Sequence, residues 1–399
     1  MATDNNHKIP NVPALRFPEF TDEWELHQTT DYFTFKNGLN PEAKRFGSGT
    51  KFISVMDILN NHYITYDKII ASVEPKENDL KEYGVNYGDI LFQRSSETLE
   101  DVGRANVYLD TKTALFGGFV IRGKKIGNYN PLFFRYMLSC PHVRKKIIVK
   151  GAGAQHFNIG QDGLSKVMLF VPKEKEQLRI GQFLNQIDER ISIQNKIIED
   201  LRQLKSALVE TMYNKSQANF KIGDVIAQVS TRNRGDNDYS VLSVNNRLGF
   251  IEQAEQFEDH LVASEDTSNY KVVSQNDFAY NPARINVGSI ARLTSFDNGI
   301  VSPMYICFHT KRQLLPEYLE YFFDTRYFYN EMQKRLEGSV RLCLSWEGLC
   351  NILIAIPSIE QQQEVGKRIA RLVDKIRLEE RFLGILKIQK QYLLQAMFI

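Results

Sequence analysis

The sequence is poor in cysteine and contains none of the common catalytic motifs. Its four cysteines are scattered through 399 residues without a CxxC pair, so we expect reduced core thiols and neither a disulfide framework nor a zinc site. No P-loop, HExxH or GxSxG sequence occurs, and the seven histidines form no evident pair with a carboxylate or a thiol. We therefore expect no independent catalysis, and no metal or cofactor bound by this chain.

Long apolar runs and a strong net charge are also absent. No stretch reaches the length of a membrane span, and the first residues lack the basic-then-apolar pattern of a signal peptide, so we expect a cytoplasmic protein without membrane contact. A hydrophobic content of 43% with 25% charged residues is typical of a globular protein of two or three domains. The net charge of +2 is too small to indicate a nucleic-acid partner, so local clusters must carry any such inference.

What the sequence does contain is an internal repeat. Residues 172–212 align with residues 357–397 without a gap, every position shifted by 185 (357 − 172). The same shift pairs Gly153 with Gly338 and residues 131–136 with residues 316–321. Further upstream the match loosens and its offset drifts. The chain therefore predicts two copies of one unit, each with a variable front and a matching back.

Two long amphipathic helices are predicted, at residues 177–213 and 362–398. The first contains no proline, and its apolar residues recur at the spacing of a heptad seam: Ile180, Leu184, Ile187, Ile191, Ile198, Leu201, Leu208 and Met212. Polar residues interrupt both seams at matching places, Gln194 and Lys205 in the first and Glu379 and Lys390 in the second. A helix of this size spans roughly 55 Å, which suits a spacer. The alternative is two unrelated surface helices, each packing on its own domain.

Chain path predicts that the two helices run antiparallel, because the domain between them should have its ends close together. The expected fold class is α+β, with two mixed α/β domains separated by two long antiparallel helices that form a coiled coil, related by a pseudo-twofold internal repeat. The expected boundaries are 1–176 for the first domain with an N-terminal arm, 177–213 for the first helix, 214–361 for the second domain and 362–399 for the second helix.

Each globular domain shows short β-rich stretches followed by a helix that starts at a proline. The stretches are 51–55, 89–92 and 118–121 in the first copy, and 239–244, 278–280 and 304–308 in the second. Asn130-Pro131-Leu132-Phe133 is close to the Asn-Pro-Pro-Phe loop of adenine methyltransferases. The second copy keeps the proline but has Leu315 before it, so we expect Asn130 to be a helix N-cap and Pro131 the first helical residue.

Polar side chains that could read DNA bases follow two predicted strands. Gln93 to Ser96 come after the strand that ends at Phe92, and Asn281 to Arg284 come after the strand that ends at Tyr280. Arginine can donate twice to guanine O6 and N7, and asparagine or glutamine can bind adenine N6 and N7, whereas a solvated loop is the alternative. With the basic residues suited to phosphate, the candidates are Lys44, Arg45, Lys51, Gln93, Arg94, Ser95, Ser96, Gln155, His156, Arg232, Arg234, Tyr280, Asn281, Arg284 and Arg341.

This arrangement resembles the specificity subunit of Type I restriction-modification systems, in which two variable target-recognition domains alternate with two similar long helices. The resemblance covers essentially the whole chain. Its most specific elements are residues 13–20 before Trp24, residues 87–92, and the proline-to-glutamine segments that open the helices. The family commonly has Pro-Pro-x-x-Glu-Gln there; this chain keeps one proline, and Lys175 departs from the pattern where Glu360 conforms.

The resemblance implies a non-catalytic subunit that binds double-stranded DNA, with each domain reading half of a bipartite site in the major groove and the rod setting the gap between the halves. It also implies two modification subunits and two restriction subunits as partners, with S-adenosylmethionine, ATP and magnesium held by those partners. Two alternatives stay open. A fused methyltransferase or nuclease would need a methyl-donor loop or a carboxylate-rich metal site, and a tandem protein-interaction module would have no DNA role.

Overall fold

The computed structural model describes residues 11–153, 156–213, 218–234, 239–246, 248–253, 267–339 and 341–399. It divides into two compact units. Unit 1 comprises residues 1–195 with residues 381–399, and unit 2 comprises residues 196–380. Each unit therefore combines one globular domain with a segment from each of the two long helices.

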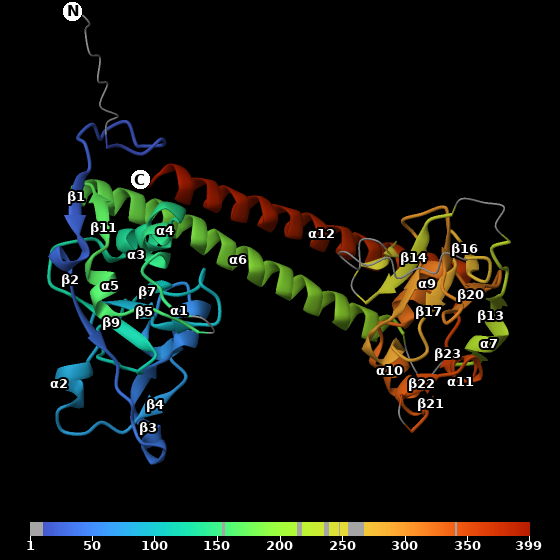
Figure 1. The fold of residues 1–399 in the computed structure, drawn as a ribbon. Helices are drawn as coiled ribbons and strands as arrows, with labels where there is room; N and C mark the ends of the chain where they lie inside the picture. Colours follow the sequence, from blue (N-terminus) through green and yellow to red (C-terminus); the bar gives the residue numbers. More distant parts are fainter. Residues whose placement is uncertain are drawn as a thin grey trace, which may run out of the picture. The chain divides into compact units, whose positions relative to one another are not determined.

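Unit 1 is built on a four-stranded antiparallel sheet in the order β2-β9-β5-β7 (Figure 1). These strands are Phe33–Asn37, Val120–Lys125, Ile90–Gln93 and Ala105–Val107. A smaller sheet has the order β4-β3-β8, with strands Ser72–Val73, Phe46–Ile53 and Leu115–Phe116, and β3 runs parallel to β8. Two antiparallel pairs complete the unit, β1 (Glu25–Gln28) with β11 (Met168–Val171) and β6 (Ser95–Ser96) with β10 (Phe157–Asn158).

Five short helices cover the sheets of unit 1: α1 (Val55–Asn60), α2 (Asp79–Tyr83), α3 (Pro131–Ser139), α4 (Pro141–Ile148) and α5 (Gln161–Ser165). Helix α3 begins as predicted, because the Asn130 side chain accepts a hydrogen bond from the Phe133 amide and Pro131 is the first helical residue. The helix supplies Phe133, Phe134 and Met137 to the main core of the unit.

Unit 2 repeats this strand pairing. Its four-stranded antiparallel sheet has the order β13-β20-β17-β18, with strands Ile226–Val229, Ile306–Thr310, Phe278–Tyr280 and Ile290–Arg292. A second sheet has the order β15-β14-β19-β16, with strands Gly249–Glu252, Val241–Asn245, Asn298–Val301 and Lys271–Ser274, and β14 runs parallel to β19 as β3 does to β8. The antiparallel pairs are β12 (Phe220–Lys221) with β23 (Leu353–Ile354) and β21 (Leu336–Glu337) with β22 (Cys343–Leu344).

The helices of unit 2 also match those of unit 1. They are α7 (Ile222–Val225), α9 (Pro316–Phe322), α10 (Arg326–Gln333) and α11 (Trp346–Cys350). Helix α9 corresponds to α3 and again starts at a proline, while the residue before it, Leu315, gives no side-chain cap. All four cysteines are free; Cys140 and Cys307 are buried as expected, whereas Cys343 and Cys350 are only half-buried.

The two long helices, α6 (Glu174–Met212) and α12 (Ile359–Ala396), start 185 residues apart (359 − 174). In unit 1, Asp188 of α6 contacts Lys390 of α12, and the main core joins Leu184 to Met397. In unit 2, Arg202 contacts Glu380 and the core joins Val209 to Ile369.

Within each unit the residue numbers rise along one helix as they fall along the other, so the helices run antiparallel. Two separate helices that pack only on their own neighbours are excluded, because the end of α12 supplies Leu393, Met397 and Phe398 to the main core of unit 1. Within the described residues, no helix combines the length and the apolar character that crossing a bilayer requires.

A buried glutamine explains the segment that opens each long helix. The Gln177 side chain donates to the Pro172 carbonyl at 2.9 Å and accepts from the Asn130 amide at 2.9 Å. Gln362, its counterpart 185 residues later, donates to the Pro357 carbonyl at 3.0 Å and accepts from the Leu315 amide at 2.8 Å. A buried side-chain amide that satisfies two backbone groups fixes the helix start against the preceding proline-led helix.

The N-terminal arm is fixed to the same place in unit 1. Arg16 donates two hydrogen bonds of 2.7 Å to the buried Glu176 carboxylate, and the Trp24 indole donates to the same group at 3.3 Å. The Leu15 amide donates to the Ala396 carbonyl at the end of α12 at 2.8 Å. The arm residues that carry the family resemblance therefore bind the start of one long helix and the end of the other.

Candidate nucleic-acid interface

In unit 1 the sheet brings two candidate loops together. Reader loop 1, residues 93–96, leaves the central strand β5 and continues into β6. Strand β6 pairs with β10, the second arm of hairpin 1, which spans residues 152–158. The Ile159 amide also donates to the Arg94 carbonyl at 2.9 Å. The exposed His156 of hairpin 1 is therefore held beside Arg94, Ser95 and Ser96.

Unit 2 builds the same pair of loops. Reader loop 2, residues 280–284, begins at the last residue of β17, and hairpin 2 spans residues 337–343 between β21 and β22. The Leu344 amide donates to the Pro282 carbonyl at 3.0 Å, just as Ile159 donates to Arg94 in unit 1. Hairpin 2 carries Arg341, which is exposed and corresponds to His156 at the 185-residue shift.

One glycine in each hairpin fixes its shape. Gly153 has a φ of +145° and Gly338 a φ of +118°, a region of backbone conformation that L residues rarely adopt. A Cβ on Gly153 would lie 2.0 Å from the His156 carbonyl oxygen, and one on Gly338 would lie 2.3 Å from the Arg341 carbonyl oxygen. The glycine that repeats in the sequence is therefore required by the backbone that presents the basic residue.

Five candidates of the two reader loops are placed where a ligand could reach them. Arg94, Ser95 and Ser96 are half-exposed, Asn281 is half-exposed and Arg284 is exposed. Arg94 is oriented by a hydrogen bond of 3.3 Å from its guanidinium to the Gly118 carbonyl. Asn281 holds its own loop, because its side-chain oxygen accepts from the Ala283 amide at 3.0 Å. Gln155 lies outside the described residues.

Three other candidates are buried, which argues against direct contact with DNA. Gln93 is 6% exposed and donates to the Ser95 carbonyl, and Tyr280 is 0% exposed with its hydroxyl donating to the Leu344 carbonyl at 3.3 Å. Burial raises the pKa of Tyr280. Arg45 is 9% exposed, and its guanidinium binds the Asp79 carboxylate and the Glu74 carbonyl. These side chains support the loops from inside and leave the set that we propose for contact.

The remaining basic candidates lie on other surfaces. Lys44 is exposed and 2.8 Å from the Glu42 carboxylate, and Lys51 is half-exposed on β3. In unit 2, Arg232 lies beside Lys271 of β16 and donates to the Asn269 side chain at 2.9 Å, and Arg234 is exposed. Exposed cations of this kind fit phosphate contacts, which position a protein without reading bases.

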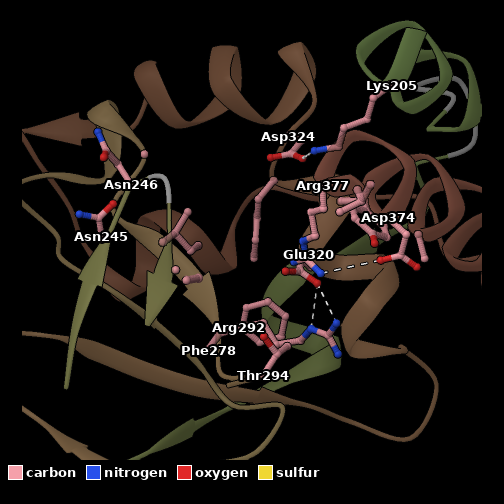
Figure 2. Close-up of a pocket in the computed structure, with 18 residues that line it drawn as sticks. Lys205, Asn245, Asn246, Phe278, Arg292, Thr294, Glu320, Asp324, Asp374 and Arg377 are labelled. Atoms are coloured by element: carbon pink, nitrogen blue, oxygen red, sulfur yellow. Dashed lines mark hydrogen bonds and ion pairs between the residues drawn. The ribbon is translucent and has the colours of Figure 1, made fainter. Parts of the chain in front are cut away.

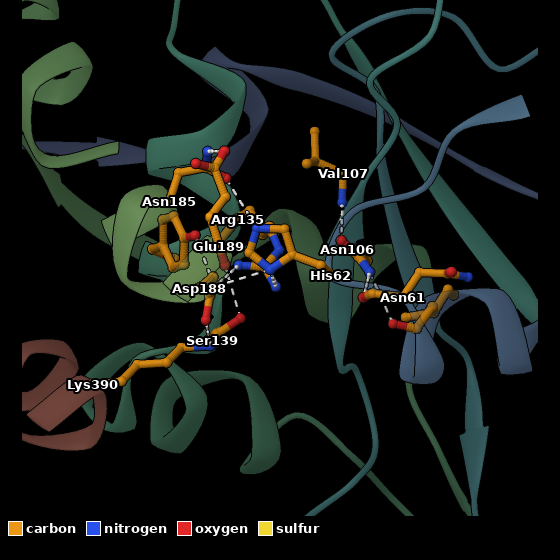
Figure 3. A network of polar contacts seen from close by, with 12 residues as sticks. Asn61, His62, Asn106, Val107, Arg135, Ser139, Asn185, Asp188, Glu189 and Lys390 are labelled. Atoms are coloured by element: carbon orange, nitrogen blue, oxygen red, sulfur yellow. Dashed lines mark hydrogen bonds and ion pairs between the residues drawn. The ribbon is translucent and has the colours of Figure 1, made fainter. Parts of the chain in front are cut away.

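Sequence reasoning missed a buried carboxylate that joins the first domain to both long helices (Figure 3). Asp188 lies 2.5 Å from the Lys390 ammonium, 3.1 Å from His62 and 3.2 Å from Arg135, and accepts from the Tyr136 hydroxyl at 2.8 Å. Burial alone would raise the pKa of Asp188, but the hydrogen bond from His62 and the charges of Lys390 and Arg135 outweigh burial and hold that pKa well below its usual range. A lone aspartate beside a heptad seam gave no signal of this role.

The matching lysine of unit 2 has a more exposed partner. Lys205 lies 2.7 Å from Asp324 at the edge of a polar cavity of about 570 Å³ (Figure 2). Arg292, which also lines this cavity, is paired with Glu317 at 2.7 Å and Glu320 at 2.9 Å. The polar interruptions shared by the two seams are thus lysines that bind carboxylates beside Tyr136 in unit 1 and Tyr321 in unit 2.

Comparisons with known proteins agree with this architecture. Residues 21–203 match the family model of the Type I restriction modification DNA specificity domain. The chain is 22% identical over 94% of its length to a putative type I restriction enzyme MjaX specificity subunit of Methanocaldococcus jannaschii, covering 92% of that protein. It is 23% identical to the MjaVIII specificity subunit of the same organism, over 92% of this chain and 89% of that one.

A solved structure shares the fold along nearly the whole chain. The type I restriction-modification S subunit of M. genitalium superposes with a TM-score of 0.58 at 15% identity, over 97% of this chain and 99% of that chain. The family model, the relatives and the fold all lead to one assignment: the chain belongs to the family of type I restriction-modification specificity subunits.

Proposed function

We propose that this chain reads a bipartite DNA site, one half-site with each recognition domain. Reader loop and hairpin 1 would contact one half in the major groove, and reader loop and hairpin 2 the other. The observation that carries the proposal is the duplication of this pair of loops, with a positive-φ glycine and an exposed or half-exposed basic or polar side chain in each copy. A duplicated reader suits a site made of two separate half-sites.

The long helices would set the number of unread base pairs between the half-sites. Helix α6 contributes to the cores of both units, and so does α12, so each is a continuous element shared by the two recognition domains. A rigid shared element fixes the separation of two readers, and fixed separation along a duplex selects one spacer length.

We also propose that the chain is a scaffold without catalysis of its own. Two modification subunits would bind it, hold S-adenosylmethionine and flip the target adenine for methylation at N6. Two restriction subunits would supply ATP- and magnesium-dependent cleavage in the full complex. These assignments follow from the family, and the chain itself would bind neither cofactor nor metal.

The direct test is co-expression of the full chain with its cognate modification subunit, followed by genome-wide mapping of methylated adenines. We expect one bipartite sequence with a constant gap. The matched variants Arg94→Ala and Arg284→Ala should each relax the choice at one half-site, with a loss of about 1 to 3 kcal/mol of base discrimination. Unchanged methylation in both variants would remove these two residues from the reader, and the absence of any sequence-specific methylation would overturn the function.

Dependence on salt separates DNA reading from a tandem protein-interaction module. Phosphate contacts release counterions, so DNA affinity should fall steeply between about 50 and 200 mM salt. Fluorescence anisotropy with a labelled duplex would measure it, using a duplex of scrambled sequence as the control for specific binding. A complex that binds no duplex at low salt would favour the protein-interaction alternative.

The spacer role is tested by shortening the rod at equivalent places. Deleting residues 196–202 and 381–387 removes one heptad from each helix, which shortens the pair by roughly 10 Å, or about three base pairs of DNA. We expect the methylated sites to have a shorter gap, or the complex to lose assembly. Full activity with an unchanged gap would show that the rod is not the ruler.

A further inference from the structure

An apolar side chain is exposed at the same β-turn in both units. Residues 117–120 connect β8 to β9, and the turn closes with a 2.9 Å hydrogen bond from the Val120 amide to the Gly117 carbonyl. Residues 302–305, at the 185-residue shift, connect β19 to β20 with a 3.0 Å bond from the Tyr305 amide to the Ser302 carbonyl. The third residue of the turn is Phe119 in unit 1, 69% exposed, and Met304 in unit 2, 60% exposed.

Both turns contact their reader loop. In unit 1 the Arg94 amide donates to the Phe119 carbonyl at 2.9 Å, and the Arg94 guanidinium donates to the Gly118 carbonyl at 3.3 Å. In unit 2 the Asn281 side-chain amide lies 3.6 Å from the Met304 sulfur. Each recognition domain thus presents a hydrogen-bonding side chain and a large apolar side chain side by side on one surface.

Around Phe119 the surface forms an open apolar cup of about 390 Å³. Its wall includes Phe46 and Met56, which are 46% and 60% exposed. Asn40 lies on its edge against Gly118, and within the described residues its side-chain amide has no hydrogen-bond partner. Three exposed large apolar side chains beside a free amide and a guanidinium are a costly arrangement for solvent alone.

We propose that these turns read thymine: Phe119 and its cup receive the C5-methyl group of a thymine in one half-site, and Met304 contacts the methyl group of a thymine in the other. The inference rests on the proposed DNA-reading function and adds the base class. In the major groove the thymine methyl is the only apolar group that a base pair displays, and its neighbours on the base edges are hydrogen-bonding atoms. An apolar surface edged by Asn40 and Arg94 matches that mixture, since asparagine pairs with adenine and arginine with guanine.

Removal of single methyl groups from the DNA tests the proposal without altering the protein. The full chain in complex with its cognate modification subunit is titrated, at one fixed salt concentration, with duplexes in which each thymine of the mapped half-sites is replaced singly by deoxyuridine. Burial of one methyl-sized group predicts a loss of affinity of about fourfold at one position or more in each half-site. A half-site without thymine, or affinities that stay the same at every substitution, would overturn the proposal.

Protein variants then connect each methyl group to its turn. Phe119→Ala should bind the thymine and deoxyuridine forms of one half-site equally and keep the fourfold difference in the other half-site, and Met304→Ala should do the converse. Ile70→Ala is the matched control, because Ile70 is 92% exposed and does not line the cup. If both half-sites keep their sensitivity in both variants, these turns do not read the methyl groups.

The outcomes for the inference and for the function are separate. Sequence-specific methylation that is indifferent to deoxyuridine overturns the thymine contact and leaves the DNA-reading function standing. A complex without sequence-specific DNA binding overturns the function, and the thymine contact is overturned with it.

Discussion

Lys390 and Lys205 occupy the same position in the two copies of the repeat but should differ strongly in their effect on stability. Lys390 approaches a carboxylate, Asp188, whose side chain is 4% exposed, whereas the partner of Lys205, Asp324, is 50% exposed. Replacing Lys390 by methionine leaves the buried Asp188 carboxylate with fewer positive charges, although Arg135 and the Tyr136 hydroxyl remain within reach.

The magnitudes follow from these exposures. Breaking a buried ion pair by removing one partner costs about 3 to 5 kcal/mol, and the contacts that remain around Asp188 reduce our expectation for Lys390→Met to about 2.5 kcal/mol. A half-exposed pair contributes about 0 to 1 kcal/mol, so Lys205→Met should have little effect. With a dependence of about 2.5 kcal/mol per molar urea, Lys390→Met should lower the unfolding midpoint of unit 1 by about 1 M.

The two tryptophans of the chain allow each unit to be followed separately. Trp24 is buried in the main core of unit 1, and Trp346 packs against the core of unit 2. Urea unfolding followed by tryptophan fluorescence in a Trp346→Phe background reports unit 1, and a Trp24→Phe background reports unit 2. Equal shifts for the two lysine variants, or an unchanged unit 1 midpoint for Lys390→Met, would refute the argument from burial.

Three further predictions concern the shared scaffold. Gln177→Ala and Gln362→Ala should each destabilise their own unit by about 1 to 3 kcal/mol, because each leaves buried backbone groups unpaired; equal loss in both units from one variant would contradict this. Gly153→Ala and Gly338→Ala should each impair methylation by displacing one hairpin, and a methylation rate equal to that of the unaltered complex would argue against hairpin contact with DNA. The depressed pKa of Asp188 means that its stabilisation is complete above about pH 4 and is lost as pH falls through its folded pKa. The difference in unfolding free energy between the natural chain and Asp188→Asn should therefore be constant from about pH 7 to 5 and shrink in stronger acid.

The sequence predicted the elements whose signal is local or duplicated. The heptad seam places α6 and α12 within three residues of their observed starts, because apolar periodicity survives over ten turns. The start of α3 was predictable because a cap and a proline act on their own helix. The duplication also pointed to Gly153 and Gly338, since a backbone conformation that only glycine adopts easily leaves the same residue in both copies.

Features that depend on distant contacts were not predictable. Arg45 looks like a free surface cation until the chain brings Asp79, 34 residues away, against its guanidinium. Tyr280 is buried because the far strand β22 covers it. The sequence places Phe119 and Met304 inside predicted strands, whereas β9 begins at Val120 and β20 at Ile306, so both apolar residues lie in exposed turns. An exposed apolar side chain has no local pattern that separates it from a core residue.

The source of the final core residues of unit 1 has a consequence for how the protein is made. Leu393, Met397 and Phe398 complete a core whose other members come from the first 191 residues. While the ribosome is still translating the middle of the message, the first domain has an unfilled apolar surface that needs protection. A premature stop codon a few residues from the end would therefore damage the domain synthesised first, and would spare most of the domain synthesised second.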